Sequence, residues 1–253
     1  MDLFRREFRA LWSALLYFTR LPLPCPVTYE PEDLRRAAGY WPLIGLLVGL
    51  VVGGGYVLSS RLLPADIAAG LALTAGILLT GAMHEDGLAD VCDGLGGGAT
   101  KQRALEIMKD SSTGVFGAIG LIVSLGLRWR LLVELPPAQI IALTVAAHTT
   151  SRAAACALLA AQDYVREGPS KARPLAQRMH RGRLALVLAL GLAPLAFLPA
   201  LYWFGTVGPA AAVLVLGLWF HRRLGGYTGD CLGATQQTGE LAFLLIAAAA
   251  AKP

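Results

Sequence analysis

Long uncharged apolar runs recur along this chain and limit what it can fold into. A membrane-spanning helix needs about 20 consecutive apolar residues, and several runs here reach that length. Hydrophobic residues make up 55% of the 253 residues and charged residues only 15%, whereas soluble domains carry about 25% charged residues. The sequence therefore predicts an all-α, polytopic membrane helical bundle, with an Ala- and Leu-rich soluble α/β enzyme as the alternative.

We expect about seven spans, within a range of about five to eight because the last two runs are short. The candidate segments are 39–61, 64–83, 114–135, 138–161, 184–204, 206–220 and 239–251. Tryptophan and tyrosine mark several of their ends, as is typical of the membrane–water interface. No long repeat or low-complexity tail divides the chain, so residues 1–253 are interpreted as one membrane-embedded domain.

The N-terminal segment, 1–38, has the pattern of a helix that lies in the membrane interface. Its apolar residues recur at helical spacing, and its first arginines fall on other faces. The apolar set is Phe4, Phe8, Leu11, Trp12 and Leu15. An amphipathic helix packed on the rest of the protein explains the pattern equally well. The short apolar piece lacks a small-residue cleavage site, so we do not expect a signal peptide.

The distribution of lysine and arginine predicts which side of the membrane each connecting segment faces. With seven spans and the N-terminus inside, the cytoplasmic segments are 1–38, 84–113, 162–183 and 221–238. They hold 17 of the 22 basic residues, as the positive-inside rule predicts. Topology thus accounts for the net charge of +5. The sequence has no basic stripe of the kind that would indicate nucleic acid binding.

Segment 84–113 begins with a dense acidic motif that directly follows an apolar run. Asp86, Asp90 and Asp93 are spaced i, i+4 and i+7, so they share one helix face. Oxygen ligands at this density suit Mg²⁺ or Mn²⁺, and Glu85 is the predicted outer ligand. The predicted metal ligands are thus Glu85, Asp86, Asp90 and Asp93. A solvated acidic face is the alternative, but it leaves unexplained the neighbouring glycines, which weaken a helix.

A second acidic pair, Glu106 and Asp110, follows with Lys109 beside it. A metal and a lysine can neutralise phosphate oxygens and charge on a leaving group. The predicted catalytic residues are therefore Asp86, Asp90, Lys109 and Asp110. Alternatively, Asp110 or Ser111 is simply the N-cap of the third span.

Several polar residues elsewhere are predicted to bind substrate. Arg152 stands near the middle of the fourth span, where an arginine is costly unless it pairs with an acid or a substrate phosphate. Backbone carbonyls or water are its alternative partners. Loop 225–235 combines glycines, hydroxyls and one carboxylate just before the last span. The predicted substrate-binding set is His84, Gly94, Ser111, Arg152, Thr228 and Asp230.

A cation or metabolite transporter is a competing interpretation, since it would explain the spans and Arg152. A transporter predicts acidic residues spread across the membrane depth and paired between two mirrored halves. Here the acidic residues are concentrated in one segment. The sequence also lacks the nucleotide P-loop and the serine nucleophile elbow.

Five segments carry patterns that occur together in one known family. They are 83–94 (MHEDGLADVCDG), 18–22 (FTRLP), 42–45 (PLIG), 106–111 (EIMKDS) with Gly114 and Gly117, and 226–235 (GYTGDCLGAT). In these pieces and their order, the chain resembles the cobalamin synthases, the adenosylcobinamide-GDP ribazoletransferases. A small departure is Val91-Cys92, which stands where small residues such as Thr-Ala are usual.

This resemblance implies the late nucleotide-loop assembly step of vitamin B12 synthesis. Such enzymes join adenosylcobinamide-GDP to α-ribazole, or to α-ribazole 5′-phosphate, to give adenosylcobalamin or its 5′-phosphate, and they release GMP. The resemblance further implies Mg²⁺ as cofactor and the lipid bilayer as a partner. We therefore expect a multi-pass protein of a bacterial or archaeal cytoplasmic (inner) membrane, and the lysine and arginine distribution places the active site on the cytoplasmic face. A homo-oligomer is left open.

Part of the acidic motif also resembles a second family. Asp90-x-x-Asp93-Gly94 is similar to the opening of the CDP-alcohol phosphotransferase motif, and Glu106-x-x-x-Asp110 is similar to its closing acidic pair. The Ala-Arg expected shortly after the first glycine is missing. A lipid-type phosphotransferase is therefore the second enzyme hypothesis.

Overall fold

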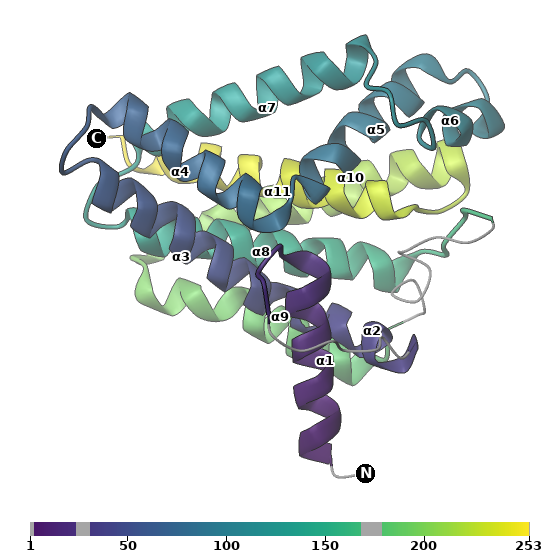
Figure 1. Ribbon diagram of the computed structural model, residues 1–253, viewed down its shortest axis with the longest axis horizontal. Helices are drawn as coiled ribbons and strands as arrows, with labels where there is room; N and C mark the ends of the chain where they lie inside the picture. The colour runs from purple at the N-terminus through teal and green to yellow at the C-terminus, as the bar shows by residue number, and fades with distance from the viewer. Residues whose placement is uncertain (1–2, 24–30, 168–178, 253) are drawn as a thin grey trace.

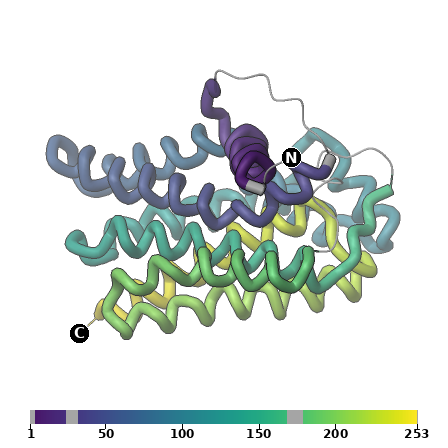
Figure 2. Tube along the Cα trace, turned by 90° about the horizontal axis from the view of Figure 1, so that it is seen from below, coloured from purple at the N-terminus to yellow at the C-terminus, as the bar shows by residue number. Residues whose placement is uncertain are grey.

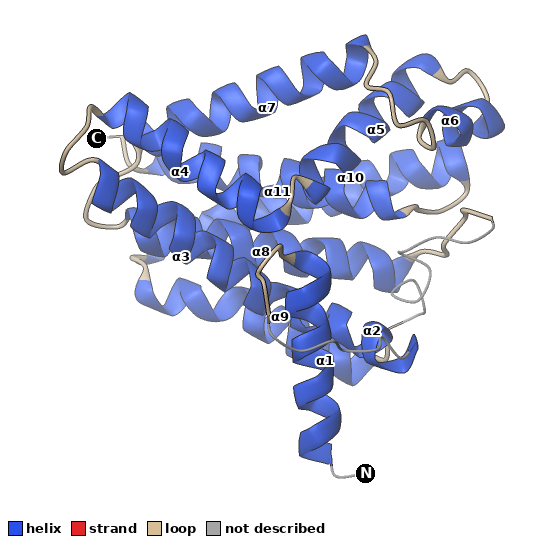
Figure 3. Ribbon diagram, in the orientation of Figure 1, coloured by secondary structure: helices blue, strands red, loops and turns tan. Residues whose placement is uncertain are grey.

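The computed structural model describes residues 3–23, 31–167 and 179–252, which form a bundle of helices (Figure 1). Within these ranges there is no β-sheet, and the one isolated bridge joins Tyr164 to Tyr227 (Figure 3). The all-α prediction is confirmed for this part of the chain. The predicted cytoplasmic segments 1–38 and 162–183 include residues that lie outside the described ranges.

Helix α8 (Ile140–Ala161) forms the centre of the bundle. It packs against α3 (Trp41–Ser59) on one side and α11 (Gly229–Ala250) on another. Almost every α8 residue between Leu143 and Leu159 is buried. Many of these residues are alanines, which favour a helix and let neighbouring helices approach closely.

A row of glycines on α3 brings this helix against α8. Gly45, Gly49 and Gly53 are spaced four residues apart, so they lie on one helix face. A Cβ atom added to Gly49 would lie 2.5 Å from the Cα atom of Val145, and those on Gly45 and Gly53 would also collide with α8. Small residues in such a row allow close packing of membrane helices. The α3–α8 contact therefore depends on these glycines.

Three helical segments are long and apolar enough to cross a membrane: Glu32–Ser59, Val115–Glu134 and Ala200–Leu224. A fourth is obtained if α4 (Ala65–Thr80) and α5 (Met83–Gly97) together make one broken span, since they are bent by 90°. These segments support a membrane protein. The expected seven spans are not confirmed in the described part of the chain.

Two of the expected spans have different boundaries in the structure. The predicted span 184–204 is not one helix, because α9 (Arg181–Leu192) gives way to the 3₁₀ helices η2 (Ala193–Phe197) and η3 (Ala200–Thr206). Pro194 and Pro199 explain the break, since proline removes helical hydrogen bonds. The η3 segment continues into α10 (Val207–Leu224).

The last helix, α11, starts well before the predicted residue 239. Thr228 is its N-cap, and the Thr228 hydroxyl accepts a hydrogen bond from the Cys231 N–H at 3.4 Å. This cap places the polar loop residues at the start of a helix whose remainder is largely buried.

The N-terminal helix α1 (Leu3–Phe18) lies across the bundle. Figure 2 shows α1 nearly end-on, while the helices of the bundle run across the view. Phe4 and Phe8 are 75% and 55% exposed, which leaves an apolar surface on this helix. The geometry fits both expectations for this segment, an interfacial helix and a helix packed on the protein. Its position in the membrane interface stays a prediction.

Glu7 fastens α1 to the bundle. Its carboxylate accepts hydrogen bonds from Tyr40 of η1 (Ala38–Tyr40), from Arg36 of α2 (Pro31–Ala37) and from Arg183 of α9, at 2.5, 3.0 and 2.7 Å. Partial burial acts to raise the pKa of Glu7, but the hydrogen bonds from Tyr40 and Arg183 outweigh burial and leave this pKa below 4.5.

Candidate active site

Helix α5 carries the acidic motif as one continuous helix. The glycines that were expected to weaken it are contact points with other elements. A Cβ atom on Gly94 would lie 2.6 Å from Cγ of Met108, which follows α6 (Lys101–Ile107). Gly94 thus lets α6 pack closely against α5, and its predicted role in substrate binding remains untested.

Gly87 brings the start of α11 against α5. A Cβ atom on Gly87 would lie 3.0 Å from the carbonyl oxygen of Asp230 and 3.4 Å from the Cα atom of Gly233. The backbone of Asp230 therefore lies against the turn of α5 that carries Asp86 and Asp90. Two motif segments far apart in the sequence meet at this point.

The carboxylates of this region form one electrostatic cluster. The negative charges of Asp230, Asp86 and Asp93 all disfavour ionisation of the Asp90 carboxyl, and Asp230 has the largest effect of the three. Asp86 is exposed and Asp90 is half-buried. Like charges repel one another unless a cation lies near them. The structure thus adds Asp230 to the acidic residues expected to act together.

Arg166 supplies positive charge to this cluster. Its Nη2 atom donates hydrogen bonds to the Oδ2 atom of Asp230 at 2.7 Å and to the carbonyl oxygen of Met108 at 3.1 Å. Burial raises the pKa of the Asp230 carboxyl, while Arg166 and the hydroxyl of Thr228 partly offset this effect. Thr228 itself is fully buried and lies 3.2 Å from Asp230 Oδ2.

Asp93 has a structural role in addition to its place on the acidic face. Its two carboxylate oxygens accept hydrogen bonds from the backbone N–H groups of Gly114 and Gly117, at 2.7 and 2.8 Å. These groups belong to the start of α7 (Val115–Glu134), whose N-cap residue is Gly114. The alternative expectation that Asp110 or Ser111 caps this helix is therefore wrong.

Lys109, Asp110 and Ser111 lie on the exposed turn between α6 and α7. The Asp110 carboxylate accepts hydrogen bonds from the backbone N–H and the hydroxyl of Ser112, at 3.0 and 2.7 Å. These bonds lower the pKa of the Asp110 carboxyl. Arg166 connects this region to Asp230 through the Met108 carbonyl. The catalytic and binding roles of the three residues stay predictions.

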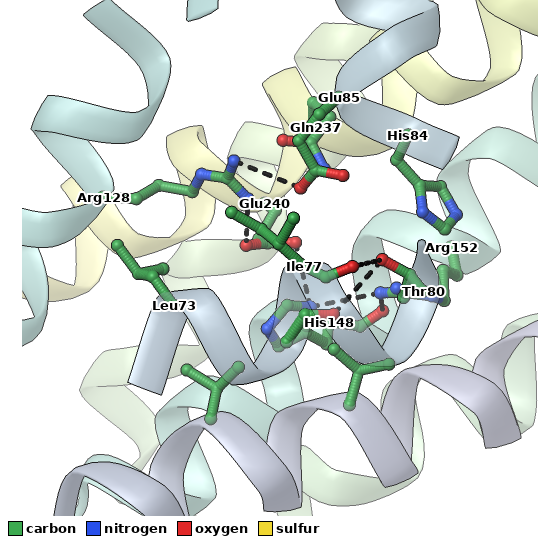
Figure 4. A pocket seen from close by; sticks show the side chains of 13 residues that line it. Leu73, Ile77, Thr80, His84, Glu85, Arg128, His148, Arg152, Gln237 and Glu240 are labelled. Carbon is green, nitrogen blue, oxygen red and sulfur yellow. Dashed lines mark hydrogen bonds and ion pairs between the residues drawn. The ribbon is translucent and has the colours of Figure 1, made fainter. Parts of the chain in front are cut away.

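A second group of charges lies inside the bundle (Figure 4). Arg128 of α7 pairs with Glu240 of α11 at 3.0 Å and lies 3.5 Å from Glu85. The Nδ1 atom of His148 lies 2.9 Å from Glu240. Gln237 donates to Glu85 at 3.1 Å. Buried charges need such partners, because an unpaired charge in a low-dielectric interior is strongly unfavourable.

His84 and Arg152 belong to this interior group. Arg152 is 1% exposed, and it contacts the ring Nδ1 and the carbonyl oxygen of His148 at 3.1 and 3.0 Å. His84 stacks on Trp41, with ring centroids 5.8 Å apart. Both line a small cavity, which has room for about one water molecule. The contact with the His148 carbonyl agrees with the alternative expectation that Arg152 pairs with a backbone carbonyl.

The predicted metal ligands divide between these two regions. Glu85 is directed into the interior, whereas Asp86, Asp90 and Asp93 belong to the cluster with Asp230. In the described ranges, no three side chains among His, Cys, Asp and Glu are arranged to hold a metal ion. Metal binding at the cluster therefore stays a prediction.

Comparisons with known proteins identify the family. The family model described as cobalamin-5-phosphate synthase matches residues 10–248. The chain belongs to this family. Curated relatives named adenosylcobinamide-GDP ribazoletransferase include those of Ralstonia pickettii, 46% identical over 96% of both chains, and Shewanella frigidimarina, 41% identical over 95% of this chain and 94% of the relative. No solved structure matches this member of the cobalamin-5-phosphate synthase family.

Sequence reasoning missed two features of this family member. Arg166 was counted only as a cytoplasmic charge, because no local pattern links it to Asp230, 64 residues away. The pair Arg128–Glu240 could have been suspected from the sequence. Each is a charge within a mainly apolar segment, and such charges in membrane proteins usually pair.

Proposed function

We propose that this chain joins adenosylcobinamide-GDP to α-ribazole, or to its 5′-phosphate, and releases GMP. The observation that carries the proposal is the convergence of segments 83–94 and 226–235 at Asp90 and Asp230. Membership of the cobalamin-5-phosphate synthase family and the names of the relatives support this reaction.

The reaction is a displacement at phosphorus. A ribose hydroxyl oxygen of α-ribazole attacks the phosphorus attached to cobinamide, and a new O–P bond forms. The bond from that phosphorus to the bridging oxygen of the diphosphate breaks, and GMP leaves with the electron pair. The hydroxyl proton passes to a base, for which Asp90 and Asp86 are the candidates. Such a displacement depends on positioning and on neutralisation of charge.

We further propose that the acidic cluster holds Mg²⁺. The ligand chemistry suits a hard cation, because Asp86, Asp90 and Asp230 all offer carboxylate oxygens, and these side chains would draw together around the ion. Asp93 also faces this cluster but already binds two backbone N–H groups of α7. When bound, Mg²⁺ would supply charge neutralisation for the diphosphate oxygens. The protein itself would hold these carboxylates and the substrate in the correct relative position.

The setting of the site is also part of the proposal. We place the protein in the cytoplasmic (inner) membrane, with the acidic cluster facing the cytoplasm. The apolar segments support a membrane location, and the bias of 17 of the 22 basic residues to the expected cytoplasmic segments supports the orientation. An arrangement of this kind gives water-soluble substrates access to the carboxylates.

The test is GMP release by the purified protein in liposomes, with adenosylcobinamide-GDP, α-ribazole and Mg²⁺ supplied. Asp90→Asn should lose most of the activity, and the matched control Glu134→Gln should keep it, because Glu134 pairs with Arg130 on the exposed end of α7. Wild-type rates for Asp90→Asn would show that this carboxylate has no essential role. Absence of GMP release by the unmodified protein would overturn the function, and a transporter would give that result.

A further inference from the structure

Arg166 occupies the point where three motif segments meet. It binds Asp230 at the start of α11 and the carbonyl oxygen of Met108 at the end of α6, and its charge also acts on Asp90 of α5. Its side chain is 15% exposed, and that of Asp230 is 17% exposed. The guanidinium is thus partly shielded from solvent but still accessible beside the acidic cluster.

The backbone holds Arg166 in this place. Val165 N–H donates to the Tyr227 carbonyl and Tyr227 N–H donates to the Asp163 carbonyl, both at 3.0 Å. Gly226 makes this pairing possible, since its φ of +158° is rarely adopted by other residues and a Cβ atom there would collide with the Asp163 carbonyl. Segment 163–166 is therefore fixed to the loop that leads into Asp230.

The other cations expected to bind phosphate lie elsewhere. Arg152 is enclosed in the interior network, and Lys109 stands on an exposed turn. A diphosphate placed at the carboxylates needs positive charge beside it, and Arg166 is in contact with one of them. An arginine has five N–H donors, and a single nitrogen of Arg166 makes both contacts described above. The buried Nε atom has no hydrogen-bond partner within the described ranges.

From this geometry we propose that Arg166 binds the diphosphate of the nucleotide substrate beside Asp90 and Asp230. The inference rests on the proposed function and adds a substrate-binding residue to it. The Asp230 carboxylate orients the guanidinium, and the remaining N–H groups donate to phosphate oxygens. Charge-assisted hydrogen bonds of this kind are short and strong, and arginine suits them because its donors form a planar fork.

The test measures binding of GDP to the purified, lipid-reconstituted protein at saturating Mg²⁺. Arg166→Ala should weaken GDP binding by about 10- to 100-fold, the range expected for loss of a charge-assisted contact. Arg166→Lys should recover part of the affinity, and guanosine should bind equally to all variants. The control is Arg103→Ala, which removes the same charge from an exposed ion pair with Glu106 on α6.

Equal affinity of Arg166→Ala and the unmodified protein for GDP would overturn the inference. An equal loss in Arg103→Ala would also overturn it, because the effect would then reflect net charge alone. If Arg166→Ala does not fold, Arg166→Gln gives the same comparison with a side chain of similar length. Failure of the proposed function is separate: it appears as absent GMP release by the unmodified protein, whatever GDP binding shows.

Discussion

Asp93 and Asp90 share a helix face, yet the structure predicts different effects on stability when each is changed to asparagine. The Asp93 carboxylate accepts two backbone hydrogen bonds from the start of α7, at 2.7 and 2.8 Å. Asparagine has one acceptor oxygen, so one of these two N–H groups loses its partner, and the Gly117 N–H is the buried one. The Asp90 carboxylate, in contrast, is repelled by the like charges of Asp230 and Asp86.

The cost of Asp93→Asn follows from the lost bond. A hydrogen bond to a charged group contributes about 1.5–3 kcal/mol, and an unpaired buried donor costs about 1–3 kcal/mol. Because these estimates describe overlapping parts of one change, we expect a net loss of about 2–3 kcal/mol. For a protein of this size, that corresponds to a thermal midpoint lower by about 4–12 °C. Asp90→Asn should leave the midpoint unchanged or raise it, because it removes repulsion.

The assay is thermal unfolding of the detergent-purified variants, followed by tryptophan fluorescence in EDTA. Both variants should lose GMP release, so activity alone does not separate the two roles. In a second scan, added Mg²⁺ should raise the thermal midpoint of the unmodified protein but not that of Asp90→Asn, since a ligand that binds the folded state raises its stability. Equal midpoints for Asp93→Asn and Asp90→Asn in EDTA would refute the structural role given to Asp93.

Three further changes test other parts of the structure. Glu240→Ala removes the closer carboxylate from buried Arg128 and leaves only the 3.5 Å contact with Glu85, so we expect a loss of up to about 3–5 kcal/mol in stability, visible as a lower thermal midpoint; an unchanged midpoint would contradict the buried pairing. Gly87→Ala places a Cβ atom 3.0 Å from a backbone oxygen of α11. The fall in kcat/KM for GMP release, expressed as a free energy, should therefore exceed the loss in the free energy of unfolding. Gly54→Ala, which meets nothing within 4 Å, is the control. The pKa of Glu7 is lowered from 4.5 in the folded protein, so its contribution to stability is present above pH 4.5 and is lost as the pH falls through the folded value. Midpoints measured from neutral to acid pH should therefore fall less steeply in Glu7→Gln, and parallel curves would exclude the contribution.

Much of the local structure could be predicted from the sequence. The helical spacing of Asp86, Asp90 and Asp93 placed them on one face, and α5 has that form. The apolar segment before them forms α4, and the segment after residue 114 forms α7. These predictions succeeded because helix periodicity and hydropathy depend on neighbouring residues. The boundary errors occurred where proline or a threonine cap altered the local hydrogen bonds.

The sequence alone determined that the chain is helical, strongly apolar and equipped with one acidic helix face, because these properties are set by residue type and spacing within a few turns. Only the tertiary structure decided which groups meet. In the folded protein, Glu85 points into the interior toward Arg128, and the Asp93 carboxylate accepts hydrogen bonds from the start of α7. Asp230 and Arg166 lie beside Asp90. These contacts join residues from separate helices, and they depend on how closely small residues such as Gly87 let those helices pack.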